Sequence, residues 1–342
     1  MCSPRFSLLS EETFLVYGTL FILCGIVAAL GNIIAFYILW MPDQRNKSNK
    51  ILSSLAISDA LTGLVVFPLN AYQTLSPNAR LSCSIDFVRA YFALLMSGSS
   101  VLTLVVIALD RYILMTRFAS YHSIMTERKI VVMLIACWLY PGLTPLLKYA
   151  GDTPYLINMI LIFFGPIILL IILYCLLIRL IYESRKKVIA HASKTNIVEN
   201  QDGRLEVAPS TSNSTEADCI DQPTKNKLSP TISAVSASKK SSKRHMKLAK
   251  SVSVLLGCYL ICLTPFNLWM ILDMVNNTSG SLSSLHLQRL YMFGVFAGAA
   301  NSCVNPFIYL SKQPGFRKRF RNILTQVRNS VLGLRPPFEE NQ

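Results

Sequence analysis

The sequence is poor in charged residues. Asp, Glu, Lys and Arg make up only 15% of its 342 residues, whereas 52% are hydrophobic and the mean hydropathy is +0.43. A disordered chain needs high charge and low hydropathy, and a water-soluble domain does not reach this mean hydropathy. Nine cysteines in a chain of this length do not make a disulfide scaffold either. A membrane protein is the class that fits.

The groups that enzymes and metalloproteins use most are also scarce. The four histidines are scattered, with no metal-ligand spacing, and no Gly-rich phosphate loop is present. The sequence therefore predicts that the protein is not an enzyme. Acidic residues number 18 against 33 Lys and Arg, a net charge of +15. In a membrane protein this excess is expected in cytoplasmic loops, so we predict no nucleic-acid partner.

Long apolar runs are what the sequence has in abundance. Seven candidate spans cover residues 13–41, 51–78, 90–109, 130–147, 153–178, 251–272 and 290–310. About 20 apolar residues cross a hydrocarbon core, and runs of this length satisfy their backbone in lipid only as helices. We predict an all-α membrane protein, a seven-transmembrane helix bundle with a short amphipathic eighth helix.

Basic residues are concentrated in alternate loops. Residues 185–250 alone carry thirteen Lys or Arg, whereas the opposite set of loops, with the N-terminal segment, carries five. Because basic residues gather on the cytoplasmic side, we predict a multi-pass plasma-membrane protein with its N-terminus outside. Residues 1–12 then form a short extracellular segment.

The bundle is expected to cover residues 13–310, with a disordered third inner loop at about 184–244. That loop is rich in Ser, Thr, Lys and Pro, and its basic ends can continue the flanking helices. Phe316, Phe320, Ile323 and Leu324 follow at helical spacing, with basic residues between them. This pattern predicts an amphipathic helix at 311–325 against membrane lipids, followed by a cytoplasmic tail at 326–342.

Asp59 is the clearest ionisable residue at membrane depth, where such groups are expensive and indicate function. It is expected to face the bundle interior, where other polar side chains can reach it. These are Asn32, Ser100, Asn301, Ser302 and Asn305. Oxygen ligands of this kind suit a hard cation. A polar network that only joins helices, or an ion or proton site in a small transporter, are the alternatives.

Two further clusters lie near the predicted inner surface. In Asp110-Arg111-Tyr112, the arginine can pair with its neighbouring carboxylate or release toward a partner, as in a two-state latch. An interface arginine that merely snorkels is the alternative. In the segment 305–309, Pro306 kinks the helix, Asn305 can satisfy the freed carbonyl, and Tyr309 can swing. Pro166 and Pro265 create similar weak points.

Together these patterns resemble the rhodopsin-like (class A) G-protein-coupled receptors over residues 14–324. The matching residues are Gly31-Asn32, Leu55-Ala56-Ile57-Ser58-Asp59, Asp110-Arg111-Tyr112, Trp138, Pro166, Tyr174, Cys262-Leu263-Thr264-Pro265 and Asn305-Pro306-Phe307-Ile308-Tyr309.

The resemblance implies an extracellular ligand and a heterotrimeric G protein as partners, with receptor kinase and arrestin acting on the third inner loop. It assigns coupling and activation to Asp110, Arg111, Tyr112, Tyr174, Pro265, Asn305, Pro306 and Tyr309. It also implies an allosteric sodium ion at Asp59, Ser100, Asn301, Ser302 and Asn305, and no other cofactor.

Several positions depart from the family pattern. The second outer loop, at 148–154, has no cysteine to pair with the third helix, which leaves Cys2 as a partner for Cys83. Leu263 stands where a sixth-helix aromatic is expected. His245 stands where an acidic residue often holds the third-helix arginine, so we predict raised basal signalling.

The resemblance also places the ligand pocket. Ala93 occupies the position of the aspartate that binds cationic amines, and Ala299 that of the retinal lysine. The pocket is expected at Ala93, Leu94, Ser97, Asn158, Phe266, Asn267, Met270 and Val295. That lining suits a small neutral or lipid-like molecule. Charged residues are expected at the rim of the pocket, so a short peptide is an alternative ligand. These residues are Asp86, Arg89, Asp273 and Arg289. A small transporter that uses Asp59 is the alternative function, although the chain shows no internal repeat.

Overall fold

The structure is a computed structural model that describes residues 8–42, 46–202, 253–273, 275, 284–312 and 314–332. Its elements are α1 (Glu11–Trp40), α2 (Lys47–Leu61), η2 (Thr62–Val66), α3 (Phe67–Leu75), α4 (Pro77–Leu81), α5 (Cys83–Thr116), α6 (Tyr121–Ile124), α7 (Glu127–Leu143), η3 (Thr144–Ala150), α8 (Asp152–Asp202), a helix at Ser253–Asp273 (helix 253–273), α10 (Ser284–Lys312) and α11 (Pro314–Val331).

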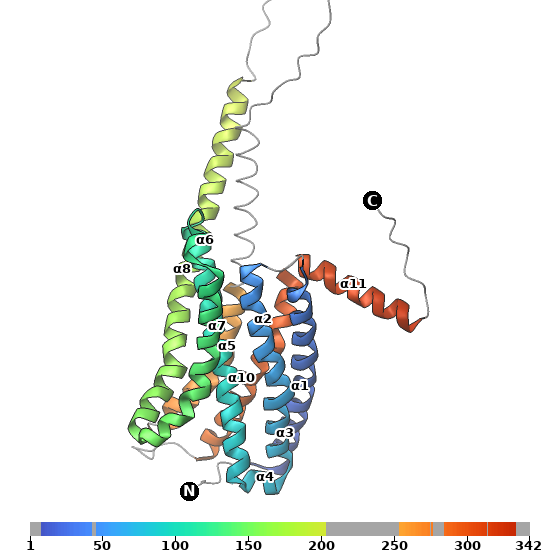
Figure 1. Cartoon of the computed structure of the whole chain (residues 1–342), viewed down its shortest axis with the longest axis vertical. Helices are drawn as coiled ribbons and strands as arrows, with labels where there is room; N and C mark the ends of the chain where they lie inside the picture. The colour runs from blue at the N-terminus through green and yellow to red at the C-terminus, as the bar shows by residue number, and fades with distance from the viewer. Residues whose placement is uncertain are drawn as a thin grey trace, which may run out of the picture.

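The long helices lie side by side as a bundle, and α11 leaves it sideways at one end (Figure 1). The helix α5 lies at the centre, in contact with α2, α3, α7 and α8. The two ends of the bundle are named after residues of α5: the Arg89 end, near α4, and the Arg111 end, near α6.

Six described helices are long and apolar enough to cross a membrane. The seventh is α10, whose 29 residues span roughly 44 Å at about 1.5 Å per residue. It carries three polar residues, Asn301, Ser302 and Asn305, and all three side chains are buried. The predicted seven-helix membrane fold is confirmed, with α11 as the eighth helix.

Short polar side chains set where several helices begin. Ser10 accepts a hydrogen bond from the Thr13 backbone N–H at the start of α1, and Asn46 accepts one from Asn49 at the start of α2. Ser82 and Thr126 do the same for α5 and α7. Such N-caps satisfy backbone donors that the first helical turn leaves unpaired.

The second predicted span is continuous but not uniformly α-helical. A π-helical turn, η2, separates α2 from α3, and Pro68 lies at the start of α3. Proline has no N–H and displaces the preceding turn, which accounts for the widened geometry here. The turn brings Gly63 against α1, where a Cβ would lie 2.4 Å from the Ala29 nitrogen and 2.8 Å from the Gly25 oxygen.

Two boundaries differ from the expected ones. The helix α8 continues past residue 184 to Asp202, and α11 continues past residue 325 to Val331. No proline or glycine interrupts either extension, which gives the helix no local reason to end. Residues 203–252 lie outside the described residues, so disorder in that part of the third loop stays a prediction.

The apolar core runs through the centre of the bundle, and its fully buried side chains include Leu55, Leu104, Ile107, Leu170 and Leu177. A second cluster joins Phe21 and Ala28 of α1 to Phe67 and Ala71 of α3. The outward faces are apolar as well: the exposed side chains of α7 include Val132, Ile135 and Leu139. Apolar surfaces on both sides are what a helix in lipid requires.

We predict that Gly63→Ala destabilises the protein, because the added Cβ meets backbone atoms of α1 that cannot rotate away. Overpacking of this kind costs about 1–3 kcal/mol. The midpoint of thermal unfolding in detergent measures it. Gly165→Ala is the matched control: a Cβ there meets no atom within 4 Å, and alanine favours a helix by about 1 kcal/mol. Equal unfolding midpoints for the two variants would contradict the close contact.

Candidate functional site

Asp59 lies at the meeting point of three helices and has no exposed surface. Its Oδ1 accepts hydrogen bonds from Ser302 Oγ at 2.9 Å and from Ser100 Oγ at 3.4 Å. Its Oδ2 accepts one from Asn305 Nδ2. The carboxylate thus joins α2 to α5 and α10, and the predicted inward orientation of Asp59 is confirmed.

The amide of Asn301 completes the polar cluster. Asn301 lies four residues before Asn305, so the two share a face of α10, and it is 3% exposed. Its Oδ1 is buried and has no hydrogen-bond partner among the described residues. A carboxylate, two hydroxyls and this orphan acceptor form an oxygen set that suits a hard cation. The described residues contain no group of three His, Cys, Asp or Glu side chains that could hold a metal.

Asn32 extends the cluster to α1. Its Nδ2 donates to the carbonyl oxygens of Ala28 and Ser302, each at 2.8 Å. A Cβ on the neighbouring Gly31 would lie 2.9 Å from Pro306 Cγ, so α1 and the proline turn of α10 touch here. The expectation for Asn305 was wrong, since its amide donates to Asp59 rather than to the carbonyl that Pro306 frees. A buried carboxylate is the stronger acceptor.

Arg111 is buried at the other end of α5, with 4% of its surface exposed. Its Nη1 lies 3.8 Å from Asp110 Oδ2, and its Nε has no partner within the part of the chain that the structure describes. A charge-assisted hydrogen bond is about 2.7–2.9 Å long, so this ion pair is loose. The local pairing expected for Arg111 is present, but it leaves most of the guanidinium donors unused. His245 lies outside the described residues.

Two other side chains hold the Asp110 carboxylate. Tyr121 OH donates to Oδ1 at 2.6 Å, and Ser48 Oγ donates to Oδ2 at 2.8 Å. Burial raises the pKa of the Tyr121 hydroxyl, and its hydrogen bond to Asp110 raises it further. Sequence reasoning missed both residues, because Ser48 and Tyr121 lie between the predicted spans, with no pattern that points toward α5.

Lysines of α2 join the same region to α6 and α7. Lys47 Nζ donates to the Met125 carbonyl oxygen at 2.8 Å, and Lys50 forms an ion pair with Glu127. The neighbouring Tyr112 is half-buried against the core. The Arg111 end is therefore a polar network across four helices, with one loosely paired arginine at its centre.

Tyr174 and Tyr309, which are expected to support activation, form no hydrogen bond with Arg111 or Asp110 in the described part of the chain. Tyr309 is 1% exposed, its ring packs 5.7 Å from that of Phe316 on α11, and its hydroxyl is buried without a described partner. Tyr174 of α8 faces helix 253–273, where a Cβ on Gly257 would lie 3.5 Å from its hydroxyl. Pro265 lies within that helix and is half-buried.

The expected ligand-pocket residues lie toward the Arg89 end, on α5, α8, helix 253–273 and α10. Ala93, Ser97, Phe266, Met270 and Val295 are half-buried, whereas Leu94, Asn158 and Asn267 are buried.

The two amides of that set differ in their partners. Asn158 accepts from Tyr140 OH at 2.8 Å and donates to Thr144 Oγ1 at 3.1 Å, so α7 and η3 hold it. Asn267 Oδ1 is buried without a described partner, which makes Asn267 the amide available to a ligand.

Arg89 lies deeper than the rim position that the sequence suggested. Its side chain is 5% exposed, and its Nη2 donates to Asp86 Oδ1 at 2.7 Å and to Tyr291 OH at 3.0 Å. Tyr291 in turn packs against Trp269, with ring centroids 4.6 Å apart. The expectation that Arg89 lines an open rim was wrong, because α3 and α10 close around it and supply polar partners.

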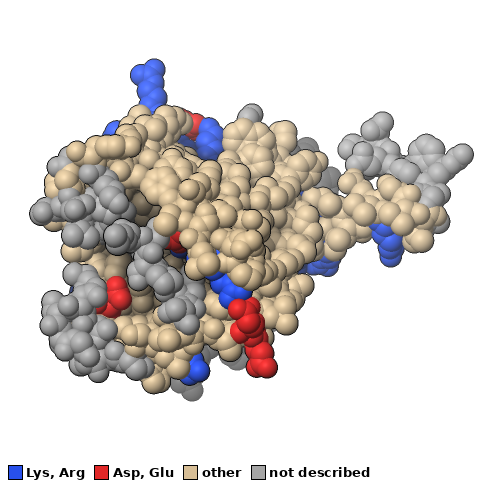
Figure 2. Space-filling view, turned by 90° about the horizontal axis from the view of Figure 1, so that it is seen from below, with Lys and Arg blue, Asp and Glu red and all other residues tan. Residues whose placement is uncertain are grey.

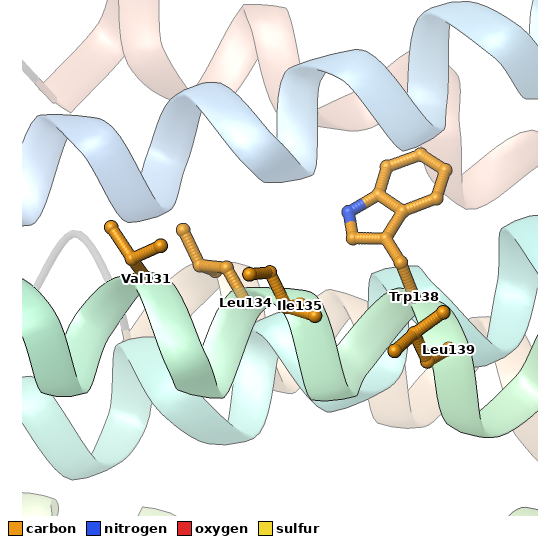
Figure 3. A pocket seen from close by; sticks show the side chains of 5 residues that line it. All are labelled: Val131, Leu134, Ile135, Trp138 and Leu139. Atoms are coloured by element: carbon orange, nitrogen blue, oxygen red, sulfur yellow. The ribbon is translucent and has the colours of Figure 1, made fainter.

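A separate groove of about 320 Å³ lies on the outer face of α7, and none of the expected pocket residues lines it. Its lining is Val131, Leu134, Ile135, Trp138 and Leu139 (Figure 3). Trp138 Nε1 donates to Ser54 Oγ of α2 at 3.1 Å. The tryptophan thus joins α7 to α2, and the groove belongs to the apolar outer surface.

Cys83, at the start of α5, is disulfide-bonded. The other described cysteines, all within spans, are free thiols. Cys2 lies outside the described residues, so its pairing with Cys83 stays a prediction.

Comparison with known proteins agrees with this geometry. Residues 31–153 and 141–309 match the family described as 7 transmembrane receptor (rhodopsin family). The chain is 23% identical over 357 residues to adenosine receptor A2a of Canis lupus familiaris, covering 95% of this chain and 75% of that protein. It is 24% identical over 346 residues to octopamine receptor beta-1R of Drosophila melanogaster, covering 93% of this chain and 63% of that protein.

The fold agrees as well. The crystal structure of squid rhodopsin superposes with a TM-score of 0.72 at 19% sequence identity, covering 99% of this chain and 93% of that one. Since the family match spans most of the bundle, the chain belongs to the rhodopsin family of seven-transmembrane receptors and is a multi-pass membrane receptor, not an enzyme.

Proposed function

We propose that this G-protein-coupled receptor binds a small lipid-like molecule or a short peptide at the Arg89 end and activates a heterotrimeric G protein at the Arg111 end. The observation that carries the proposal is the loosely paired, buried Arg111. The family assignment favours this function over a transporter that uses Asp59.

A buried arginine with one distant carboxylate is an unstable arrangement. Removing its charge from water costs several kcal/mol, which a 3.8 Å pair with an unpartnered Nε only partly offsets. Ser48 and Tyr121 compete with Arg111 for the Asp110 oxygens. A partner that offers carbonyl or carboxylate oxygens at this end therefore stabilises a state in which Arg111 leaves Asp110.

Relatives carry the names of amine and adenosine receptors. A cationic amine is not the ligand that we propose, because Ala93 provides no counter-ion at the position that the family uses. The half-buried Phe266 and Met270 and the orphan Asn267 Oδ1 suit an apolar ligand with a hydrogen-bond donor.

The membrane arrangement follows from the same function. We place the receptor in the plasma membrane with the N-terminus outside, since the described basic residues Lys47, Lys50, Arg117 and Lys129 lie at the Arg111 end, as does α11. The Ser/Thr-rich segment of the third inner loop is then available to a receptor kinase and to arrestin. A sodium ion held by Asp59, Ser100, Asn301 and Ser302, with Asn305 orienting the carboxylate, would favour the arrangement of α2, α5 and α10 described above.

Ligand-free activity depends on Arg111. We expect the wild-type chain, expressed in cells, to raise nucleotide exchange on at least one G-protein subtype above the level of Arg111→Ala. Asp110→Asn should raise it further, because the arginine then loses its only charged partner among the described residues. If Arg111→Ala and the wild type are equally active with every subtype, basal coupling through Arg111 is ruled out.

Tyr121 sets how firmly Asp110 holds Arg111. We expect Tyr121→Phe to lower ligand-free activity, since the carboxylate loses a competing donor at 2.6 Å and pairs more closely with the arginine. Nucleotide exchange at matched surface expression measures the change. Tyr37→Phe, at a residue 59% exposed on α1, is the matched control. Raised activity in Tyr121→Phe would reverse the proposed role.

Sodium should stabilise the receptor through Asp59. We expect sodium chloride to raise the midpoint of thermal unfolding relative to choline chloride at equal ionic strength, and Asp59→Asn to abolish the difference. Asp273→Asn, a carboxylate outside the cluster, should retain it. A sodium-dependent shift that survives in Asp59→Asn would remove the ion from this site.

A further inference from the structure

We propose that the Arg89 end is built to receive an organic anion, a carboxylate or phosphate attached to an apolar or aromatic body. This inference rests on the proposed function, because it names the chemistry of the ligand.

Arg89 is incompletely satisfied. A guanidinium has five N–H donors, and Arg89 makes one charged contact, to a single oxygen of Asp86. Its contact to Asn70 Oδ1 is long, at 3.5 Å, and its buried Nε finds no acceptor in the described ranges. Arginine recognises carboxylates and phosphates best through two parallel hydrogen bonds, and a second anionic oxygen is the group that this site lacks.

Asp86 is a weak internal counter-ion. Its side chain is 29% exposed, so water solvates the carboxylate, and its Oδ1 also accepts from Gln73 Nε2 at 3.2 Å. Arg89 itself is almost fully buried. An entering anion that excludes water would therefore interact with the guanidinium more strongly than the half-solvated carboxylate does.

Aromatic side chains beside Arg89 form the part of the site that would contact the body of the ligand. Tyr291, which accepts from Arg89, packs against Trp269, and Phe266 lies 5.5 Å from Trp269 between ring centroids. Phe266 belongs to the expected ligand pocket. Arg89 lies one helical turn from Ala93 on α5, so both lie on the same face of that helix. A charged head at Arg89 would thus leave its apolar body among aromatic side chains.

The described charged residues at this end do not form a basic patch. In Figure 2, seen from the side on which α4 lies, the Lys, Arg, Asp and Glu atoms of the described residues are scattered over the face. Recognition of an anion here depends on Arg89 rather than on a basic patch.

Four probes that share a phenyl group on a four-carbon chain and differ in the polar group test the proposal. They are 4-phenylbutanoic acid, 4-phenylbutyl phosphate, methyl 4-phenylbutanoate and 4-phenylbutylamine. The purified full-length receptor is titrated with each, and the rise in its unfolding midpoint gives an apparent affinity. We expect the acid, the phosphate or both to stabilise the wild type, and the ester and the amine to be without effect. A comparison of the affinities for the acid and the phosphate shows which of the two headgroups the site prefers.

Substitutions distinguish a role of Arg89 in anion binding from a role in an internal ion pair alone. Arg89→Gln should lose roughly 10- to 100-fold in anion affinity, the range expected when a charge-assisted hydrogen bond is removed. Arg89→Lys keeps the charge but loses the paired donors, so it should bind the anions more weakly than the wild type does. This variant replaces Arg89→Gln in the test if Arg89→Gln fails to fold. Asp86→Asn should increase anion affinity, because it removes the internal competitor. Arg80→Gln, at an arginine paired with Glu11 on the same side, should leave anion affinity unchanged.

Equal stabilisation by the ester and the acid would overturn the proposal. So would an anion effect that survives in Arg89→Gln, or the absence of any anion effect in both the wild type and Asp86→Asn. Binding is measured without a G protein. A receptor that binds anions but does not promote nucleotide exchange therefore contradicts the proposed function, and active coupling without anion preference contradicts only this inference.

Discussion

The buried carboxylate of Asp59 is the constraint on which the packing of the bundle depends. A charge without exposed surface is tolerated only when hydrogen bonds surround it, and those bonds come from α5 and α10. These helices must therefore meet α2 at one depth. Asn32 ties α1 to the same point through the Ser302 carbonyl oxygen. One polar cluster thus sets the relative position of four helices at this depth.

The central helix α5 carries two buried arginines, one near each end. Arg89 and Arg111 are each 4% exposed, each has a neighbouring aspartate, and each has a buried Nε without a described partner. They lie roughly 33 Å apart, at about 1.5 Å per residue. Because a single helix joins them, a movement of α5 changes the surroundings of both charges together. Ser100, between them, places the Asp59 cluster on the same helix.

Much of the site was predictable because lipid makes polar residues conspicuous. Asp59, Asn301 and Asn305 are recognisable in apolar runs, and an inward orientation follows from the cost of placing them in lipid. Ser48 and Tyr121 were not predictable, since polar residues between the apolar runs are ordinary and only the folded chain brings them to Asp110. The burial of Arg89 was not predicted for a similar reason. Arg89 lies shortly after a loop in the sequence, and the partners that enclose it come from α3 and α10.

The sequence by itself determined the number of spans, their helical form and the family, because span length, helix-only backbone pairing and local motifs are all properties of contiguous residues. Only the tertiary structure decided which donors each buried charge receives. Asn305 donates to Asp59 across 246 residues of sequence, and Arg89 reaches Tyr291 across 202. Hydrogen bonds over such separations depend on how the helices pack, which no local pattern encodes.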